Sequence, residues 1–235
     1  CSGPEDVSPP EYFWGYNRMM TIEGLFGAGD AVGGTPHAFS SGSFTEGRLS
    51  AKAACRYIDD GKGEGIVVSD KRINELKEKI YKPMEHYKIY RNEVVAGDVN
   101  PNYINPRQGL DRLQKLMDEY CGGATVSYMT NEKLLSIGLK KLKVMEEDLE
   151  KLAASDFHEL LRAWELMHRH RTAECVTQHT MFRKETRWPG YYYRGDAMKL
   201  DDENWHVLTV SRRDPKTGEY TMEKAPVYHL VKNGE

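Results

Sequence analysis

Hydrophobic residues return at helical spacing through the middle of the chain, over residues 131–178. Apolar positions three and four residues apart share one face of a helix, and the first such run is Leu135, Leu139, Leu142, Met145, Leu149 and Leu152. Asp156, with Glu159 three residues later, resembles a capping box that starts a second helix. The pattern therefore predicts a helical hairpin or bundle, and its second helix is expected to bury Phe157, Leu160, Leu161, Trp164 and Met167.

Two further helices are expected upstream of this hairpin. A charged helix is predicted over 70–82, with an interruption at Pro83, because proline removes a backbone hydrogen bond, and a resumption beyond it. Asn105 followed by Pro106 is typical of an N-cap and a first helical residue. These two residues predict a helix that ends at Tyr120.

The last part of the chain favours extended backbone and turns. The segment 188–191, Trp-Pro-Gly-Tyr, predicts a turn, and the tyrosines at 191–193 favour a strand. Strands are expected near 205–212 and 219–224, on either side of a hairpin loop at 214–218. We therefore expect a short β or extended tail after the helices.

The N-terminal part predicts one strand–loop–helix unit. Residues 22–34 are typical of a short buried strand that runs into a glycine-rich turn. A polar loop over 35–42 follows, and a helix is expected from Ser43 to about Ile58. Such a unit belongs to the α/β class. The predicted fold class is therefore α/β plus α.

Composition narrows the class of protein. The chain has 235 residues and a formal net charge of -3, so no general attraction to nucleic acid or to an anionic membrane is expected. No apolar run of about 18 residues is present, so we expect no membrane insertion. The first residue is Cys1 rather than Met, and no signal peptide precedes the fold, which suggests a piece of a longer cytoplasmic protein.

The four cysteines do not form a metal-binding pattern. They lie at positions 1, 55, 121 and 175 without a CxxC spacing, so we expect no metal site in this chain. Cys55 falls in the helix predicted after the glycine-rich turn, among small and aromatic residues, and we expect it to be a buried free thiol.

Candidate chemistry is concentrated between Gly27 and Phe44. The glycines allow sharp turns and a close approach of a ligand, and Asp30 could accept hydrogen bonds from ligand hydroxyls. The serines at 40–43 precede or open a helix, whose free N–H groups favour an electron-rich ligand such as a flavin ring. His37 could act as an acid or contact an anion. A glycine-rich turn before a helix is also common without a ligand, and GxGxxG is absent, so both interpretations stay open.

Two groups of basic residues lie further along the chain. The first is expected to form a solvated helix face rather than a metal site and comprises His168, Arg169, His170, Arg171 and His179. The second, Arg183, Arg187 and Arg194, could bind an anion or make salt bridges.

Four motifs carry a family resemblance. Residues 24–30, GLFGAGD, resemble the second flavin-binding element of the fumarate reductase and succinate dehydrogenase flavoproteins. The arginine that binds a dicarboxylate in those enzymes has no counterpart, and Ala38 lies about where it would be. The segment that follows, residues 36–48, departs from the fumarate reductase motif and is instead similar to the α subunits of adenylylsulfate (APS) reductases. Two distant segments share this similarity, WGYNRM at 14–19 and TRWPGYYYR at 186–194.

The resemblance implies a division of the chain and a cofactor. FAD would sit non-covalently between an upstream Rossmann-type part and the element found here. Residues 1–126 would be the C-terminal portion of a Rossmann-like FAD-binding domain with inserted helices, and 127–235 a helical C-terminal domain with an extended tail. His37 matches the family's active-site histidine, and the implied flavin contacts are Gly29, Asp30, Ser41, Gly42, Ser43 and Phe44.

The resemblance also implies a reaction and partners. Adenylylsulfate would be reduced to sulfite and AMP, or the reverse, through a sulfite adduct at flavin N5. Electrons would come from an iron–sulfur β subunit, which carries the clusters. Because the upstream parts are not in this chain, we expect the chain alone to be inactive. The alternatives are another flavoprotein of this superfamily, such as a fumarate reductase or an L-aspartate oxidase, and a non-catalytic docking fragment.

Overall fold

The computed structural model forms two compact units, residues 1–69 with 228–235 and residues 70–227. Within these units it describes residues 14–20, 22–29, 40–65, 67–95 and 100–227. The domain boundary predicted between residues 126 and 127 lies inside the second unit. That boundary, which came from the family resemblance, stays a prediction. No helix of the described ranges is both long and apolar enough to cross a membrane.

The first unit is built on one long helix, α1, Ser40–Asp59. Its core consists of Tyr16, Met19 and Ala53, against which Phe26 and Tyr57 pack. The rings of Tyr16 and Tyr57 meet edge to face with centroids 5.1 Å apart, a geometry that aromatic pairs prefer. The segment before the glycine-rich turn is thereby packed against the C-terminal half of α1.

The strand predicted from residue 22 is wrong for the residues that the structure describes. Residues 22–29 form turns, and their one β-type contact is an isolated antiparallel bridge between Met19 and Phe26. Gly24 has a φ of 82°, which an extended strand cannot contain, whereas the φ of 64° at Gly29 agrees with the predicted glycine-rich turn. Ile22 and Leu25 are exposed, so this segment lacks the burial that the prediction assumed.

The predicted helix of the first unit is confirmed, with one correction to its start and one to its packing. Helix α1 begins at Ser40, three residues before the predicted Ser43, and ends at Asp59, next to the predicted Ile58. Cys55, expected to be buried, is exposed on this helix as a free thiol. The buried face of α1 runs through Ala53 instead.

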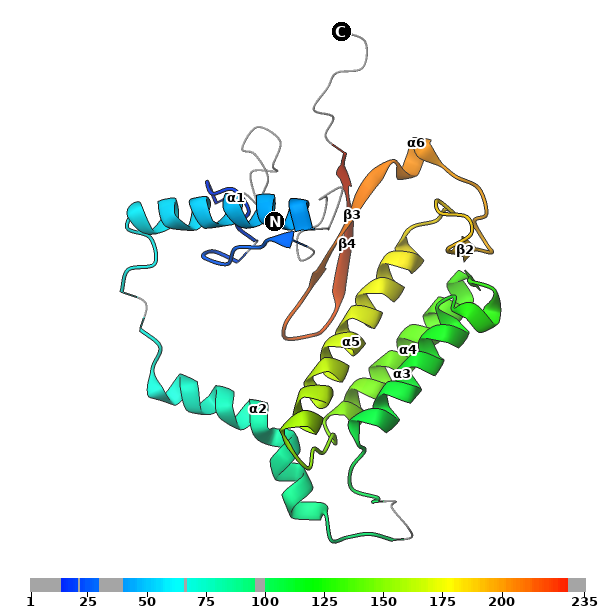
Figure 1. Ribbon diagram of the computed structural model, residues 1–235. Coiled ribbons are helices and arrows are strands. Elements are labelled where there is room, and N and C mark those ends of the chain that lie inside the picture. Colours follow the sequence, from blue (N-terminus) through cyan, green and yellow to red (C-terminus); the bar gives the residue numbers. More distant parts are fainter. Residues whose placement is uncertain (1–13, 21, 30–39, 66, 96–99, 228–235) are drawn as a thin grey trace. The chain divides into compact units, whose positions relative to one another are not determined.

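The second unit is centred on three packed helices, α3 Pro106–Tyr120, α4 Glu132–Leu149 and α5 Phe157–Phe182 (Figure 1). The predicted hairpin is therefore confirmed. The core of this bundle is made of Leu113, Leu142, Met145, Leu149, Leu152, Ala163, Leu166 and Ala173. Each fully buried leucine or methionine stabilises the fold by about 1.5–3 kcal/mol relative to exposure.

The helix starts follow the local sequence signals. Asn105 caps α3 in a full capping box with Gln108, and Pro106 is the first helical residue. Asp156 caps α5 by accepting a hydrogen bond of 2.9 Å from the Glu159 amide. The Glu159 carboxylate bonds Ser155 rather than the cap residue itself. Both predicted starts are confirmed, because caps depend on residues within one turn.

The buried face of α5 differs from the predicted one. Leu160 is buried as predicted, but Phe157 and Leu161 are exposed. The buried positions are Leu160, Ala163, Leu166, His170, Ala173 and Thr177. The alanines in this stripe let neighbouring helices approach closely, whereas the bulkier stripe through Phe157 would hold them apart.

Helix α2, Asp70–Tyr90, continues through Pro83 rather than stopping there. Figure 1 shows that the helix bends part-way along its length, as expected where proline removes a helical hydrogen bond. Pro83 is buried, and its carbonyl accepts a hydrogen bond of 3.0 Å from the Ala154 amide. The bend is therefore held by the segment that joins α4 to α5.

Short β elements complete the second unit. A 3-10 turn, η3 Ala124–Val126, leads to β1, Met129–Thr130, which pairs in parallel with β2, Tyr193–Arg194. After the single turn of α6, Asp202–Trp205, strands β3, Val207–Arg213, and β4, Tyr220–Pro226, form the predicted antiparallel hairpin. The helical part with a short β tail is thus confirmed, and the Rossmann-like part stays a prediction.

Candidate functional site

The predicted site falls around the start of α1. Gly29 and the residues Ser41, Gly42, Ser43 and Phe44 are described by the structure, whereas Asp30 and His37 lie outside the described residues. Ser41 to Phe44 all belong to the first turns of α1, which begins at Ser40. The structure therefore places four of the predicted residues together on one helix end.

Gly29 lies against this helix end. Its φ of +64° is in the left-handed region, and a Cβ there would lie 3.3 Å from Ser43 Oγ. A side chain at this position would be strained and would crowd the helix. The absence of a side chain at Gly29 therefore allows the glycine-rich turn to pack closely against α1.

The exposed face of this helix end is a shallow groove of about 440 Å³, lined by Ser40, Ser43, Phe44, Gly47, Arg48 and Ala51. Phe44 is 78% exposed, so the groove offers an aromatic face to a ligand. No acidic residue lies in the first turn, so the positive end of the helix dipole is not neutralised there. A flat apolar ring with an electron-rich edge, as in a flavin, fits this arrangement.

An ion pair between the partly buried Arg18 and the buried Glu46 holds α1 against the preceding segment. Arg18 Nη2 donates to Glu46 Oε1 over 2.9 Å, and Glu46 is only 6% exposed. Arg18 adopts a φ of 66°, which is unusual for a residue with a side chain. A second link is the hydrogen bond of 2.8 Å from the Tyr16 hydroxyl to Asp60, just after the helix. The preceding segment thus contacts α1 both near its start, through Glu46, and just after its end, through Asp60.

The three arginines near the C-terminal tail pair internally. Glu185 is fully buried, and Arg183 and Arg187 donate to its Oε1 over 2.6 Å and 2.7 Å. Burial alone would raise the pKa of Glu185, but hydrogen bonds from Arg187, the Asp201 amide and Arg183 lower it below its ordinary value. Of the two interpretations left open, salt bridges are therefore correct for these two arginines. Glu185 was missed, although arginines two residues away on either side were a possible signal.

Arg194 is likewise a structural residue. Its guanidinium is buried, donates to the Thr180 and Arg183 carbonyls at the end of α5, and pairs with Asp196 over 2.8 Å. A cation beside the last carbonyls of a helix is favourable. The hydrogen bond from Arg194 lowers the pKa of Asp196 to about 2.

The expected histidine-rich solvated face is wrong for His170. That side chain is buried, and its Nε2 lies 2.8 Å from the Leu142 carbonyl. His179 is half-buried between Thr209 and Ser211, and burial, with the nearby Arg183, lowers its pKa. Within the described ranges no three metal-ligating side chains gather.

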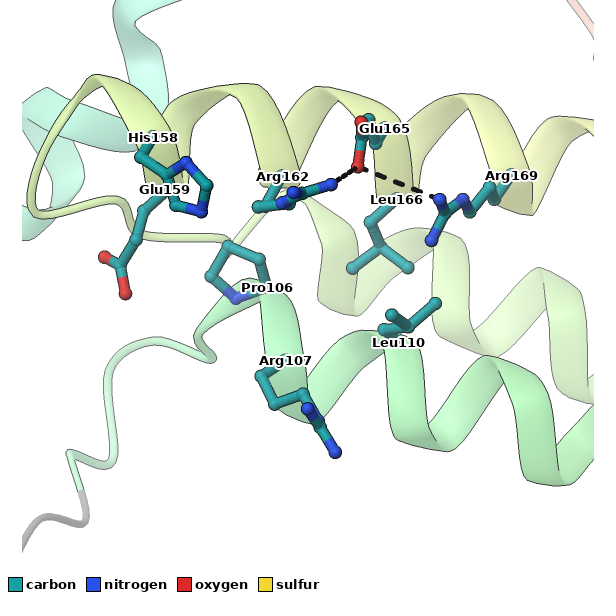
Figure 2. Close-up of a pocket in the computed structure, with 9 residues that line it drawn as sticks. All are labelled: Pro106, Arg107, Leu110, His158, Glu159, Arg162, Glu165, Leu166 and Arg169. Atoms are coloured by element: carbon teal, nitrogen blue, oxygen red, sulfur yellow. Dashed lines mark hydrogen bonds and ion pairs between the residues drawn. The ribbon is translucent and has the colours of Figure 1, made fainter.

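A second pocket, of about 300 Å³, lies between α3 and α5 (Figure 2). Figure 2 shows Glu165 between Arg162 and Arg169. The Glu165 carboxylate pairs with these two arginines over 2.7 Å and 3.8 Å. Arg107 pairs with Asp111 over 3.0 Å on the other wall. Because neighbouring carboxylates already pair with Arg107, Arg162 and Arg169, we expect this pocket to bind anions weakly.

Comparisons with known proteins agree on one family. The C-terminal family of fumarate reductase flavoproteins matches residues 110–232. The chain is 41% identical, over 98% of its length, to the adenylylsulfate reductase α subunit of Megalodesulfovibrio gigas.

Two solved structures are similar over the same span. One is adenylylsulfate reductase from the hyperthermophilic Archaeoglobus fulgidus, with 52% identity, a TM-score of 0.90 and 98% of this chain covered. The other is adenosine-5-phosphosulfate reductase in complex with sulfite as a covalent adduct, with 51% identity, a TM-score of 0.90 and 98% covered. The chain spans 36% of the length of each of these three relatives.

Proposed function

The chain belongs to the fumarate reductase flavoprotein C-terminal family, and from that premise we propose that its full-length protein is the flavin-carrying α subunit of an adenylylsulfate reductase. The identity of 52% to one such enzyme, over nearly the whole chain, is the observation that carries this proposal. Fumarate reductases and L-aspartate oxidases are disfavoured because the expected dicarboxylate arginine is replaced near Ala38.

The start of α1 would hold part of an FAD molecule. Phe44 offers an aromatic face, Gly29 permits a close approach, and the amides of Ser41, Gly42 and Ser43 lie at the positive end of the helix dipole. Asp30 would accept hydrogen bonds from the cofactor. When bound, the flavin would supply the two-electron chemistry between the substrate and an external electron carrier.

The reaction would cleave the bond between sulfur and the bridging oxygen of adenylylsulfate. Two electrons would reduce sulfur(VI) to sulfur(IV), and AMP would leave with the bridging oxygen. His37 would lie beside the sulfate group and, as a hydrogen-bond donor, would stabilise its negative charge. The electrons would come from an iron–sulfur β subunit in a cytoplasmic complex. In the reverse direction, sulfite and AMP would yield the same two electrons.

A turnover assay tests this proposal. The full-length protein, co-expressed with its iron–sulfur partner, would be assayed for ferricyanide reduction with AMP and sulfite, and with succinate or L-aspartate as controls. Fumarate reduction by a reduced viologen dye would be measured separately. We expect activity that requires both AMP and sulfite. Activity with a dicarboxylate alone would replace this function by that of a related flavoprotein.

A further inference from the structure

A third groove lies between α3 and α4, at a distance in sequence from the flavin-binding segment. It has a volume of about 440 Å³, and its apolar floor comprises Leu116, Tyr120, Ile137, Val144 and Met145. Met145 belongs to the bundle core, so the floor of the groove is the outer surface of that core. The groove is therefore formed by two helices that pack on a shared core.

Helix α4 exposes a second apolar stripe along this groove. Its core stripe runs through Leu135, Leu142 and Met145. Ile137 and Val144 are 39% and 59% exposed, and they lie seven residues apart, which places them on one face two turns from each other. A helix whose apolar stripe extends beyond its own core favours contact with a further element.

The rim of this groove is basic. Arg112, Lys115, Lys140 and Lys141 line it, against the single carboxylate of Glu119. Arg112 also pairs with Asp148 over 2.8 Å, and positive charge remains in excess when that carboxylate is counted. Lys140 and Lys141 are both exposed, although the whole chain has a net charge of -3. Lys115 pairs with Glu119 over 3.8 Å, so the excess charge of the groove lies on Lys140 and Lys141. The α3–α5 pocket differs, because carboxylates pair with all three of its arginines.

We propose that the α3–α4 groove binds an acidic amphipathic helix of another protein chain. The apolar residues of that helix would contact Leu116, Ile137 and Val144, and its carboxylates would face Lys140 and Lys141. Two packed helices leave a groove into which the ridge of a third helix fits. The apolar floor disfavours nucleic acid, which would require cations along the whole surface. This docking site does not depend on the proposed reaction.

The first test measures binding of a synthetic helix. The probe is a fluorescein-labelled peptide of about 18 residues, or about five turns, with leucines along one face and glutamates beside them. Fluorescence anisotropy with the full-length flavoprotein should give saturable binding that weakens with added salt. The double variant Lys140→Glu, Lys141→Glu should raise the Kd by about tenfold or more. A peptide with lysines in place of the glutamates should not bind.

The matched control reverses two exposed lysines elsewhere in the same unit, Lys77→Glu with Lys79→Glu on α2. It should leave the Kd unchanged. Thermal unfolding of both double variants should match the wild type, because all four side chains are exposed.

A second measurement covers the case in which the native partner already fills the groove. Photoactivatable benzoylphenylalanine in place of Val144 would be cross-linked in the purified complex with the iron–sulfur subunit. A cross-link to an acidic helix of that subunit, lost in the Lys140→Glu, Lys141→Glu variant, supports the proposal. A cross-link to the flavoprotein's own upstream chain overturns the proposal. The proposal is also overturned if the peptide shows no charge-sensitive binding and no cross-link to an acidic helix of the iron–sulfur subunit forms.

Discussion

Arg18 and Glu46 form an ion pair that joins the segment before the glycine-rich turn to the first turns of α1. The side chains meet at 2.9 Å, and Glu46 is buried. Glu46 follows the proposed flavin contact Phe44 by two residues, so the pair fixes the helix end without itself facing the groove. We therefore interpret both as positioning residues.

Removal of the charge on Glu46 should destabilise the fold. Glu46→Gln leaves the partly buried Arg18 without its counter-ion, and because Arg18 keeps some contact with solvent we expect a cost of about 1–3 kcal/mol. We expect a lower free energy of unfolding in the full-length protein and weaker flavin retention, measured by denaturant titration and by absorbance. The control Glu75→Gln removes an exposed carboxylate paired with Arg72 and should cost less than about 1 kcal/mol. Equal effects of the two substitutions would contradict the positioning role.

Gly29 should not tolerate a side chain. Gly29→Ala places a residue with a Cβ at φ +64° and brings that Cβ to 3.3 Å from Ser43 Oγ. Gly61 provides a matched control, because it has a φ of +71° and nothing within 4 Å of its Cβ position. Both alanine variants should lose about 1–2 kcal/mol from backbone strain, but only Gly29→Ala should also reduce the flavin content. Full flavin content in Gly29→Ala would show that the close approach to α1 does not matter.

The ion pair of Arg194 and Asp196 should make the thermal stability of the fold depend on pH. Because the hydrogen bond from Arg194 lowers the pKa of Asp196 from 3.8 to about 2, this pair stabilises the folded state above the ordinary pKa. Its contribution is lost as the pH falls through the folded value. The difference in Tm between wild type and Asp196→Asn should therefore be largest near about pH 5 and should shrink toward about pH 2. A difference that stays constant over this range would contradict the assignment.

The sequence predicted the two capped helix starts well and the buried face of one helix poorly, for a physical reason. The caps at Asn105 and Asp156 depend on groups within one turn, so nearby residues determine them. The buried face of α5 depends on contacts with α4, and α5 has apolar residues on two sides. Only the packed structure shows that the stripe through Ala163, rather than that through Phe157, is buried.

The candidate site was predictable to a similar degree. The residues of the glycine-rich turn and of α1 were found because glycines before a helix have a recognisable pattern and a family likeness. The Glu185 cluster was not found, because its significance lies in burial and in partners as distant as the Asp201 amide. Buried charge networks arise from long-range folding, which residue spacing does not encode.

Turnover of the variant His37→Ala tests most directly whether this chain supplies part of the active site. The measurement is kcat of the full-length flavoprotein with its iron–sulfur partner, with AMP and sulfite as substrates. We predict a loss of about ten- to ten-thousand-fold, the range that a positioned acid or base supplies, with wild-type flavin content. His168→Ala, an exposed histidine on α5, should retain normal turnover. Unchanged turnover in His37→Ala would contradict the account and place the chemistry on other residues.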